Sequence, residues 1–296
     1  MPFTVITSIH QGAREEQQDA AGHISDGKHL LVVLCDGAGG HRGGSRASKV
    51  GVVTARNAFE QAKGRFSDPP AALRDICKTA NEEIIRLGET PKLAPRSTIV
   101  TLYLDGQQAH WIYMGDSRIY RLRDGKILDR TKDHTMVQIL LQHGEITEEE
   151  MGTHPDQGRL LRALGSEEEF RPTSLSFDLG KNDAFLLCSD GFWERTTRAE
   201  IENLFSTTPT QEKLDAAVAQ AVQRNGSRGD NVAVQIVYFD QTALPPSMVR
   251  WPFLLLLILA FLLAASQVLG YLDFGIFPKK LAMPPQSTMA LPVESR

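Results

Sequence analysis

Apolar residues recur with two different periods along residues 1–240, and the two periods separate predicted strands from predicted helices. Alternating or continuous apolar runs, which are typical of strands, occupy residues 3–9, 29–35, 97–104, 109–114, 117–122, 174–177, 184–189 and 231–239. Helical spacing occupies residues 45–62, 70–87, 135–143, 198–205 and 211–224. The polar stretch 145–171 has little periodicity and indicates an excursion over the surface. This order predicts an α+β fold in which two sheets pack face to face with helices outside.

Four aspartates stand where these apolar runs end or begin. Asp36 follows VVLC, Asp116 follows WIYMG, Asp190 follows FLLCS and Asp230 precedes NVAVQIV. An ionised carboxylate at the end of a buried strand is costly unless an arginine or a divalent cation meets it. Several carboxylates from well-separated segments suit Mg²⁺ or Mn²⁺, which prefer oxygen ligands. The pattern therefore predicts a metal-assisted hydrolase.

The chain changes character after residue 240. Residues 252–269 carry no charged side chain, and this length is close to the roughly 20 residues that cross a bilayer as a helix. Trp251 and Tyr271 flank the stretch as interfacial anchors would. The predicted organisation is a catalytic domain over 1–240, a linker over 241–250, a transmembrane helix over 251–271 and a short disordered tail over 272–296. A buried core helix is the alternative, but the linker sequence ALPPS separates the apolar stretch from the body.

Charge and cysteine content limit which partners and which cellular compartment are expected. The formal net charge is −4, and no basic patch is interleaved with aromatic residues, so nucleic acid is not an expected partner. The cysteines Cys35, Cys77 and Cys188 form no CxxC pair, which fits a reducing compartment. The N-terminus lacks the pattern of a signal peptide. With the predicted C-terminal span, these features predict a single-pass protein of the cell inner membrane whose catalytic domain is cytoplasmic.

Six short motifs follow one another in the order of a known family. They are Arg14…Asp19, Asp36-Gly37-x-Gly39-Gly40-His41, Gly115-Asp116-Ser117-Arg118, Thr131-x-Asp133-His134, Ser189-Asp190-Gly191 and Asp230-Asn231. With these motifs the chain resembles the metal-dependent protein phosphatases of the 2C type, the PPM family, in their short bacterial form. The resemblance covers residues 4–239 and implies a four-layer α-β-β-α sandwich. It also implies hydrolysis of phosphoserine and phosphothreonine in proteins, with two Mn²⁺ or Mg²⁺ ions and a third, weaker ion.

The resemblance also implies a role for the acidic positions. Asp36 would bridge the two ions, and the carbonyl of Gly37 would complete one of them. Asp190 and Asp230 would hold the other ion, and Asp19 would support the centre directly or through water. A carboxylate with two oxygens suits bridging, and a glycine at 37 lets the backbone approach closely. For Asp190 and Asp230, a helix cap or a turn is the alternative interpretation.

Three further residues are candidates with an open alternative. Arg14 would bind the substrate phosphate through its planar fork, or else pair with a neighbouring glutamate. Asp116 would provide the third metal position, or else serve as a structural turn acid. Ala38 stands where relatives carry a histidine or a methionine, and alanine cannot transfer a proton. His41 is therefore a candidate acid for the leaving group, or else a residue that supports the loop.

Two hypotheses of function differ in whether the chain catalyses a reaction. The first is a metal-dependent serine/threonine phosphatase tethered to the membrane, acting on phosphorylated proteins that include a Ser/Thr kinase or its targets. The second is a catalytically silent, membrane-anchored adaptor that binds a phosphorylated partner. The four aspartates and Arg14 favour the enzyme, because a silent binder has no need of them. No cysteine has an arginine six positions later and no GxxxxGK is present, which disfavours cysteine-based and P-loop chemistry.

Overall fold

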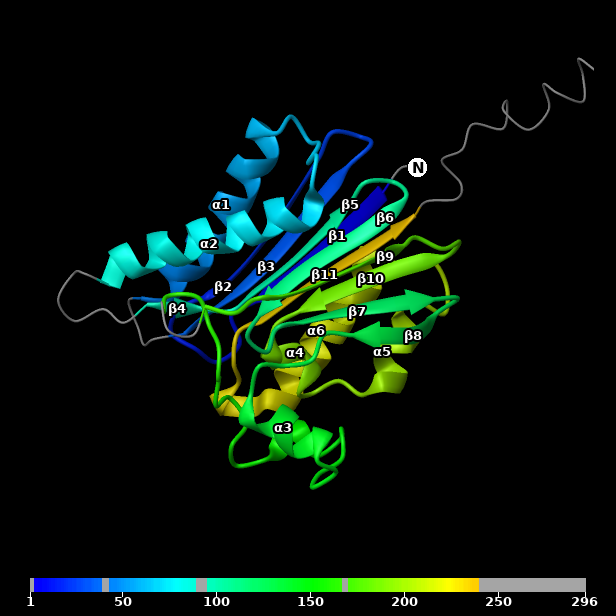
Figure 1. The fold of residues 1–296 in the computed structure, drawn as a ribbon. Coiled ribbons are helices and arrows are strands. Elements are labelled where there is room, and N and C mark those ends of the chain that lie inside the picture. Colours follow the sequence, from blue (N-terminus) through cyan, green and yellow to red (C-terminus); the bar gives the residue numbers. More distant parts are fainter. Residues whose placement is uncertain (1–2, 39–42, 89–94, 167–169, 240–296) are drawn as a thin grey trace, which may run out of the picture. The chain divides into compact units, whose positions relative to one another are not determined.

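The computed structural model describes residues 3–38, 43–88, 95–166 and 170–239, all within one compact unit, Met1–Ala243 (Figure 1). One sheet has the order β1 (Phe3–His10), β11 (Val232–Phe239), β10 (Asp183–Cys188), β7 (Arg118–Arg123) and β8 (Lys126–Arg130). The other has the order β2 (Asp19–Ser25), β3 (Leu30–Ala38), β5 (Ile99–Leu104), β6 (Gln108–Met114) and β9 (Thr173–Asp178), and the short β4 (Arg96–Ser97) pairs with β3. Neighbouring strands are antiparallel in both sheets.

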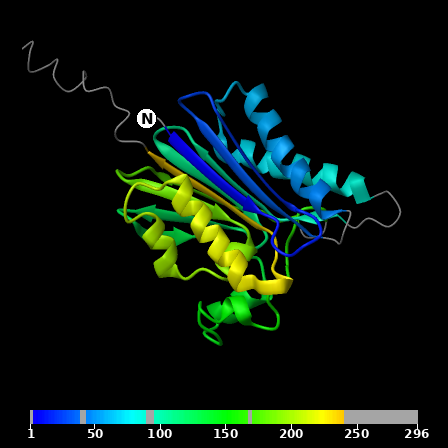
Figure 2. The same ribbon diagram turned by 180° about the vertical axis from the view of Figure 1, so that it is seen from behind.

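Helices cover the outer face of each sheet, as the two opposite views show (Figures 1 and 2). The helices α1 (Gly44–Gln61) and α2 (Pro69–Gly88) pack on the sheet that contains β3, whereas α4 (Asp190–Trp193), α5 (Arg198–Leu204) and α6 (Gln211–Asn225) pack on the other sheet. The helix α3 (Met136–Gln142) and the 3₁₀ turn η1 (Met151–Thr153) lie in the excursion between β8 and β9, and a second 3₁₀ turn, η2 (Gly226–Arg228), follows α6. The predicted sandwich of two sheets with helices outside is therefore confirmed.

Alternation along the strands explains the three layers of core. In β3, Leu31 and Val33 pack toward the helices α1 and α2. Val32 and Leu34 point the other way and pack between the two sheets. Because both faces of β3 are buried, its sequence reads as a continuous apolar run rather than as an alternating one. A third cluster fills the space between the other sheet and α4–α6.

Local sequence signals explain where several helices begin. Thr197 and Glu200 form a reciprocal capping box at the start of α5. Thr210 accepts the backbone N–H of Lys213 at the start of α6, and Thr135 caps α3 in the same way. Such caps bond N–H groups that would otherwise lack a partner in the first turn.

Two strands and one short helix were missed by the periodicity. Strand β2 has the sequence DAAGHIS, whose small and polar residues carry little strand preference, and it pairs along its full length with β3. Strand β8 is only five residues long, KILDR. Helix α4 has four residues, which is too short to show a helical period. Pairing with neighbours, rather than local pattern, establishes the two strands.

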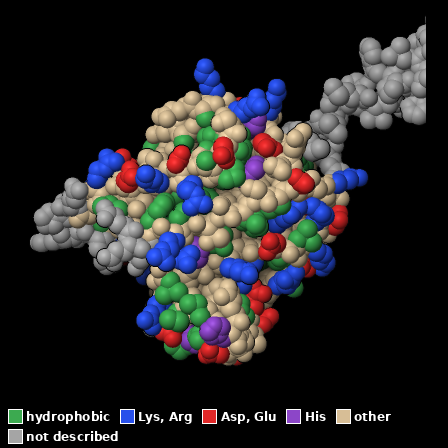
Figure 3. Space-filling view, in the orientation of Figure 1, with side chains coloured by type: hydrophobic (Ala, Val, Ile, Leu, Met, Phe, Trp, Pro, Cys, Tyr) green, Lys and Arg blue, Asp and Glu red, His purple; other side chains and the backbone are tan. Residues whose placement is uncertain are grey.

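Two further features of the structure concern membrane-spanning helices and surface charge. No helix among the described residues combines the length and the apolar character that crossing a bilayer requires. The predicted span 251–271 lies outside the described residues, so it stays a prediction. On the face shown in Figure 3, acidic and basic side chains are interspersed.

Candidate metal centre

A polar cavity of about 510 Å³ opens at the edge where the two sheets meet the loops. It is lined by Arg14, Glu15, Glu16, Gln18, Asp36, Gly37, Ala38, Thr98, Asp116, Gln157, Gly158, Leu160, Asp190, Asp230 and Asn231. All four aspartates at the ends of apolar runs are in this set. The cavity also contains Arg14, the predicted phosphate-binding residue.

Strand register explains why acids far apart in sequence meet at this edge. Asp19 begins β2 and lies directly opposite Asp36 on β3. In the other sheet, Cys188 at the end of β10 pairs with Arg118 at the start of β7. Asp190 follows the first of these positions and Asp116 precedes the second, so both carboxylates lie at the same edge.

The main chain around Asp36 is held by the neighbouring segment. The Asp36 N–H donates to Thr98 Oγ1 at 2.9 Å, and its carbonyl accepts from the Thr98 N–H at 2.8 Å. Next to it, a Cβ on Gly37 would stand 2.2 Å from the carbonyl oxygen of Gly44. Only glycine allows this approach, which brings the backbone of β3 against the start of α1.

Asp19, Asp36 and Asp190 form a group of neighbouring buried carboxyl groups. Burial, followed by the charges of Asp190 and Asp19, raises the pKa of Asp36 well above its ordinary value. Burial likewise raises the pKa of Asp19, although Ser189 Oγ donates to Asp19 Oδ2 at 2.7 Å. Burial and the charge of Asp230 raise the pKa of Asp190. Each shift means that the ionised form of these carboxyls lacks compensating positive charge.

Asp230 has the opposite environment, because Arg14 occupies both of its oxygens. Arg14 Nη2 donates to Oδ2 at 2.6 Å and Nε donates to Oδ1 at 3.0 Å. The two side chains are 55% and 41% exposed, so this is a surface ion pair of modest strength. In the described residues, the acidic partner of Arg14 is thus Asp230 rather than the neighbouring Glu15 or Glu16.

Asp116 is buried at the inner wall of the cavity. It follows Gly115, whose φ of +110° is in the range that L side chains rarely adopt. Burial and the charge of Asp190 raise the pKa of Asp116. Asp116 lines the same cavity as Asp36, Asp190 and Asp230.

The donor set fits hard divalent cations. Among the described residues, no group of three or more His, Cys, Asp or Glu side chains is gathered tightly enough to hold an ion by itself. However, Asp19 Oδ1 and Asp190 Oδ1 are buried, and neither has a hydrogen-bond partner within that part of the chain. Unpaired buried carboxylate oxygens beside repelling neighbours are what an oxygen-binding cation would stabilise. The predicted ligands therefore fit Mn²⁺ or Mg²⁺.

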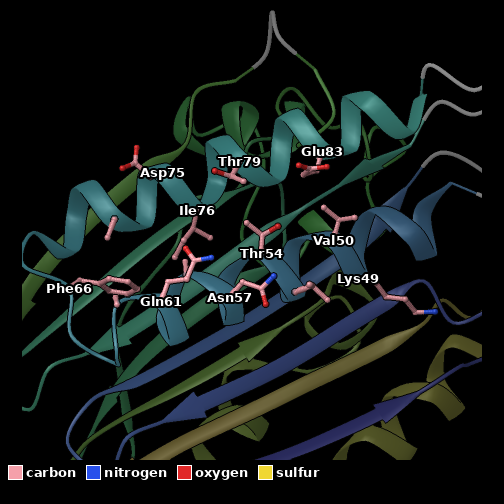
Figure 4. A pocket seen from close by; sticks show the side chains of 14 residues that line it. Lys49, Val50, Thr54, Asn57, Gln61, Phe66, Asp75, Ile76, Thr79 and Glu83 are labelled. Carbon is pink, nitrogen blue, oxygen red and sulfur yellow. The ribbon is translucent and has the colours of Figure 1, made fainter.

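A larger cavity, about 850 Å³, lies between α1 and α2 and does not offer the same chemistry (Figure 4). Its acids Asp75 and Glu83 are both on α2, eight positions apart, which is about 12 Å along a helix. They cannot share one ion. The smaller, acidic cavity is therefore the candidate site.

Sequence reasoning gave no role to Asn231, which holds the loop that carries Arg14. Its Oδ1 accepts the Gln18 N–H at 2.8 Å, and its Nδ2 donates to the carbonyls of Gln11 and Glu16. The motif Asp230-Asn231 contained the signal, but only the folded loop reveals the partners. His41 lies outside the described residues, so its role stays a prediction.

Comparisons with known proteins assign this sandwich and its acidic cavity to a class, the serine/threonine protein phosphatases. The sequence profile described as "Protein phosphatase 2C" matches residues 8–230. The chain is 31% identical to serine/threonine phosphatase stp of Listeria monocytogenes over 217 residues, which cover 72% of this chain and 85% of that protein. The crystal structure of PstP/Ppp from Mycobacterium tuberculosis is similar with a TM-score of 0.71 and 28% identity, covering 81% of this chain and all of that one.

A further solved structure shows the catalytic domain of a protein phosphatase PstP in complex with two manganese ions. It has a TM-score of 0.70 and 27% identity, and the match covers 80% of this chain and 99% of that one. Given the profile match and these likenesses, the chain belongs to the protein phosphatase 2C family. It is thus an enzyme of the protein-serine/threonine phosphatase class, and the family predicted from the six motifs is confirmed.

Proposed function

We propose that this chain removes phosphate from phosphoserine and phosphothreonine residues of proteins, and that the reaction requires Mn²⁺ or Mg²⁺. The observation that carries the proposal is that four aspartates from separate segments line one cavity together with Arg14. Membership of the family supports the reaction. The two manganese ions of the PstP structure support the choice of metal.

The aspartates would hold the ions from different sides. Asp36 and the Gly37 carbonyl would contribute ligands to the ions, as would Asp190 and Asp230, since all four residues line the same cavity. Asp19 would support the centre, since its Oδ1 is buried without a hydrogen-bond partner among the described residues. When bound, two divalent ions lower the pKa of a water molecule and neutralise charge on phosphoryl oxygens.

Two further positions complete the ligand set. Asp116 would provide the third, weaker metal position, because it lines the same cavity as the other acids. Ala38 cannot protonate the leaving oxygen, so His41 remains the proposed acid or loop support.

Arg14 would orient the substrate by binding its phosphate. A guanidinium can bond two phosphate oxygens at once, and Arg14 already shows such two-bond geometry toward Asp230. If Asp230 held an ion, the arginine would be free to face the phosphate.

The test is hydrolysis of a chromogenic aryl phosphate and of matched phosphoserine, phosphothreonine and phosphotyrosine peptides by the purified chain. We expect turnover with Mn²⁺ or Mg²⁺, loss in excess chelator and recovery when metal is restored, with little activity on phosphotyrosine. Phosphopeptide binding without metal-dependent turnover would instead support the silent adaptor.

We also propose that residues 251–271 tether the catalytic domain to the cytoplasmic side of the inner membrane. The support is the uncharged stretch 252–269 with Trp251 and Tyr271 at its ends. A tether raises the effective concentration of substrates in the same membrane, such as a Ser/Thr kinase or its targets. Deleting 244–296 should release the chain from sedimented membranes and leave kcat/KM on an aryl phosphate unchanged. Release without any loss of action on membrane-bound phosphoproteins would contradict the proposed use of the tether.

A further inference from the structure

A buried arginine lies behind the acidic cavity without lining it. Arg118, two residues after Asp116, is 3% exposed. Its Nε donates to Asp133 Oδ1 at 2.9 Å and its Nη2 donates to Asp133 Oδ2 at 2.6 Å. The third nitrogen, Nη1, donates to the Tyr120 hydroxyl at 3.0 Å. All three guanidinium nitrogens are therefore engaged in fixed directions.

The guanidinium also stacks on an indole that belongs to the Asp190 segment. Arg118 Cζ lies 3.4 Å from the centroid of the Trp193 ring. At the edge of the same indole, Trp193 Nε1 donates to the carbonyl oxygen of Asp116 at 2.9 Å. Trp193 ends the one-turn helix α4, which begins with Asp190. One side chain thus joins the main chain that carries Asp116 to the helix that carries Asp190.

The same turn is held from a second direction by His134. Its Nδ1 accepts the Gly115 N–H at 3.2 Å, and its Nε2 meets Thr173 Oγ1 at 3.0 Å. Its ring stacks on Tyr113 with centroids 5.0 Å apart. Thr173 begins β9, where the excursion returns to the sheet, so both ends of the excursion are fixed against the turn before Asp116.

Stability alone gives a weak reason for this arrangement. Replacing a buried ion pair by apolar residues is often neutral or stabilising, because desolvation offsets much of the Coulomb attraction. Both side chains of the ion pair, Asp133 and Arg118, are buried. The ion pair and the stack instead fix geometry. The planar guanidinium and the indole N–H hold the segment of Asp116 in a defined position relative to the helix α4.

We propose that Arg118 and Trp193 are positioning residues, which set the spacing between the carboxylates of Asp116 and Asp190. The inference rests on the proposed metal-dependent hydrolysis, because the spacing matters only where both carboxylates serve the same cluster of ions. Groups that orient metal ligands from behind change metal affinity when they are removed.

Trp193→Phe is the sharpest variant, because it keeps an aromatic ring near Arg118 but lacks the N–H that reaches Asp116. The smaller ring also removes buried volume, which a matched control has to account for. We expect Mn²⁺ binding, measured by calorimetry on the full chain, to weaken about tenfold. The Mn²⁺ concentration for half-maximal activity should rise by the same factor, with kcat recovering at saturating Mn²⁺. A purely structural defect would lower the active fraction at every Mn²⁺ concentration without this shift. Arg118→Lys should give a larger effect of the same kind, because both the fork and the stack are lost.

Matched controls exist on the same sheets. Trp111→Phe makes the identical change at a ring that is 2% exposed in the core between the sheets. Arg121→Lys mirrors Arg118→Lys, because Arg121 also pairs with a buried aspartate, Asp183, and stacks on Phe177. Both controls should leave Mn²⁺ affinity unchanged.

A second readout needs no metal. In chelator, amide hydrogen exchange at residues 115–118 should be faster in Trp193→Phe than in the wild type, while Trp111→Phe leaves it unchanged. Wild-type exchange together with wild-type Mn²⁺ affinity in a folded Trp193→Phe chain would overturn the positioning role. The two proposals can fail separately. A wild-type chain that bound no Mn²⁺ would contradict the proposed function. In that case the exchange measurement would still test the positioning role, and unchanged exchange in Trp193→Phe would overturn it.

Discussion

Strand β10 has an aspartate near each end, and the two carboxylates have opposite surroundings. Asp183, its first residue, accepts from Arg121, Arg123 and the backbone N–H of Gly180. Asp190, two residues after its last, leaves a buried oxygen with no hydrogen-bond partner among the described residues. This fold can therefore neutralise a buried carboxylate with arginine. Asp190, at the cavity edge, has no such arginine bonded to its buried oxygen in the described part of the chain, and its carboxylate therefore suits a bound cation.

The largest effect is expected from a substitution among the carboxylates of the cavity. Asp36→Asn should reduce hydrolysis of an aryl phosphate by about 1,000-fold, or roughly 4 kcal/mol, because a neutral amide would be a poor ligand for the proposed ions. In chelator, the same variant should be more stable than the wild type by about 1–2 kcal/mol, because a repelling charge near Asp19 and Asp190 is gone. Steady-state kinetics and denaturant unfolding measure the two effects. A variant that lost both activity and stability would contradict this account.

The same Asp→Asn substitution at Asp183, at the other end of β10, should lower stability and leave activity unchanged. Asp183→Asn leaves Arg121 and Arg123 without their carboxylate partner and should lower stability, although both arginines keep some access to water. Activity per folded molecule should be unchanged, because Asp183 does not line the cavity. Denaturant unfolding and kcat in Mn²⁺ give the comparison. A kcat loss beyond the loss of folded protein would show that the two ends are coupled.

The cavity acids could be found from the sequence because strand ends are a local signal. Asp36, Asp116, Asp190 and Asp230 each adjoin an apolar run, and antiparallel pairing brings such ends to one edge. The partners behind the cavity could not be found in this way. Asp133 is fifteen positions from Arg118, and Trp193 stacks on it across a gap of 75 positions, so only the folded chain brings them together.

The same distinction holds for whole elements. The long apolar runs of β3 and β10 were predicted within two or three residues of their ends. Strand β2 was missed, because its sequence gains strand character only through pairing with β3. Arg14, the predicted phosphate ligand, lines the cavity. Its ion pair with Asp230 could not be predicted, because the two residues are 216 positions apart in the sequence.

Acid titration separates the two ends by a smaller effect. Burial alone would raise the pKa of Asp183, but hydrogen bonds from Arg123 and Gly180 outweigh it and hold the pKa below its ordinary value. The native state then binds fewer protons than the unfolded chain. The stability that Asp183 contributes is therefore complete above about pH 4 and is lost as pH falls through its native pKa.

The measurement is the free energy of unfolding of the wild type and Asp183→Asn between pH 6 and pH 3. The difference should be constant down to about pH 4 and then shrink by at most about 1.4 kcal/mol per pH unit, the slope for one proton. A difference that stayed constant to pH 3 would contradict the claim that the hydrogen bonds to Asp183 lower its pKa in the native state.

The smallest effect concerns Arg14, which is exposed and pairs with an exposed carboxylate. Arg14→Lys should change the free energy of unfolding by less than about 0.5 kcal/mol, since surface ion pairs contribute little. It should raise KM for a phosphopeptide about five- to tenfold with kcat nearly unchanged, because an ammonium binds phosphate as a point charge without the two-bond fork. The control Arg121→Lys should do the opposite, lowering stability and leaving KM unchanged. If Arg14→Lys lowered kcat and left KM unchanged, the guanidinium would act on the transition state rather than in binding the substrate.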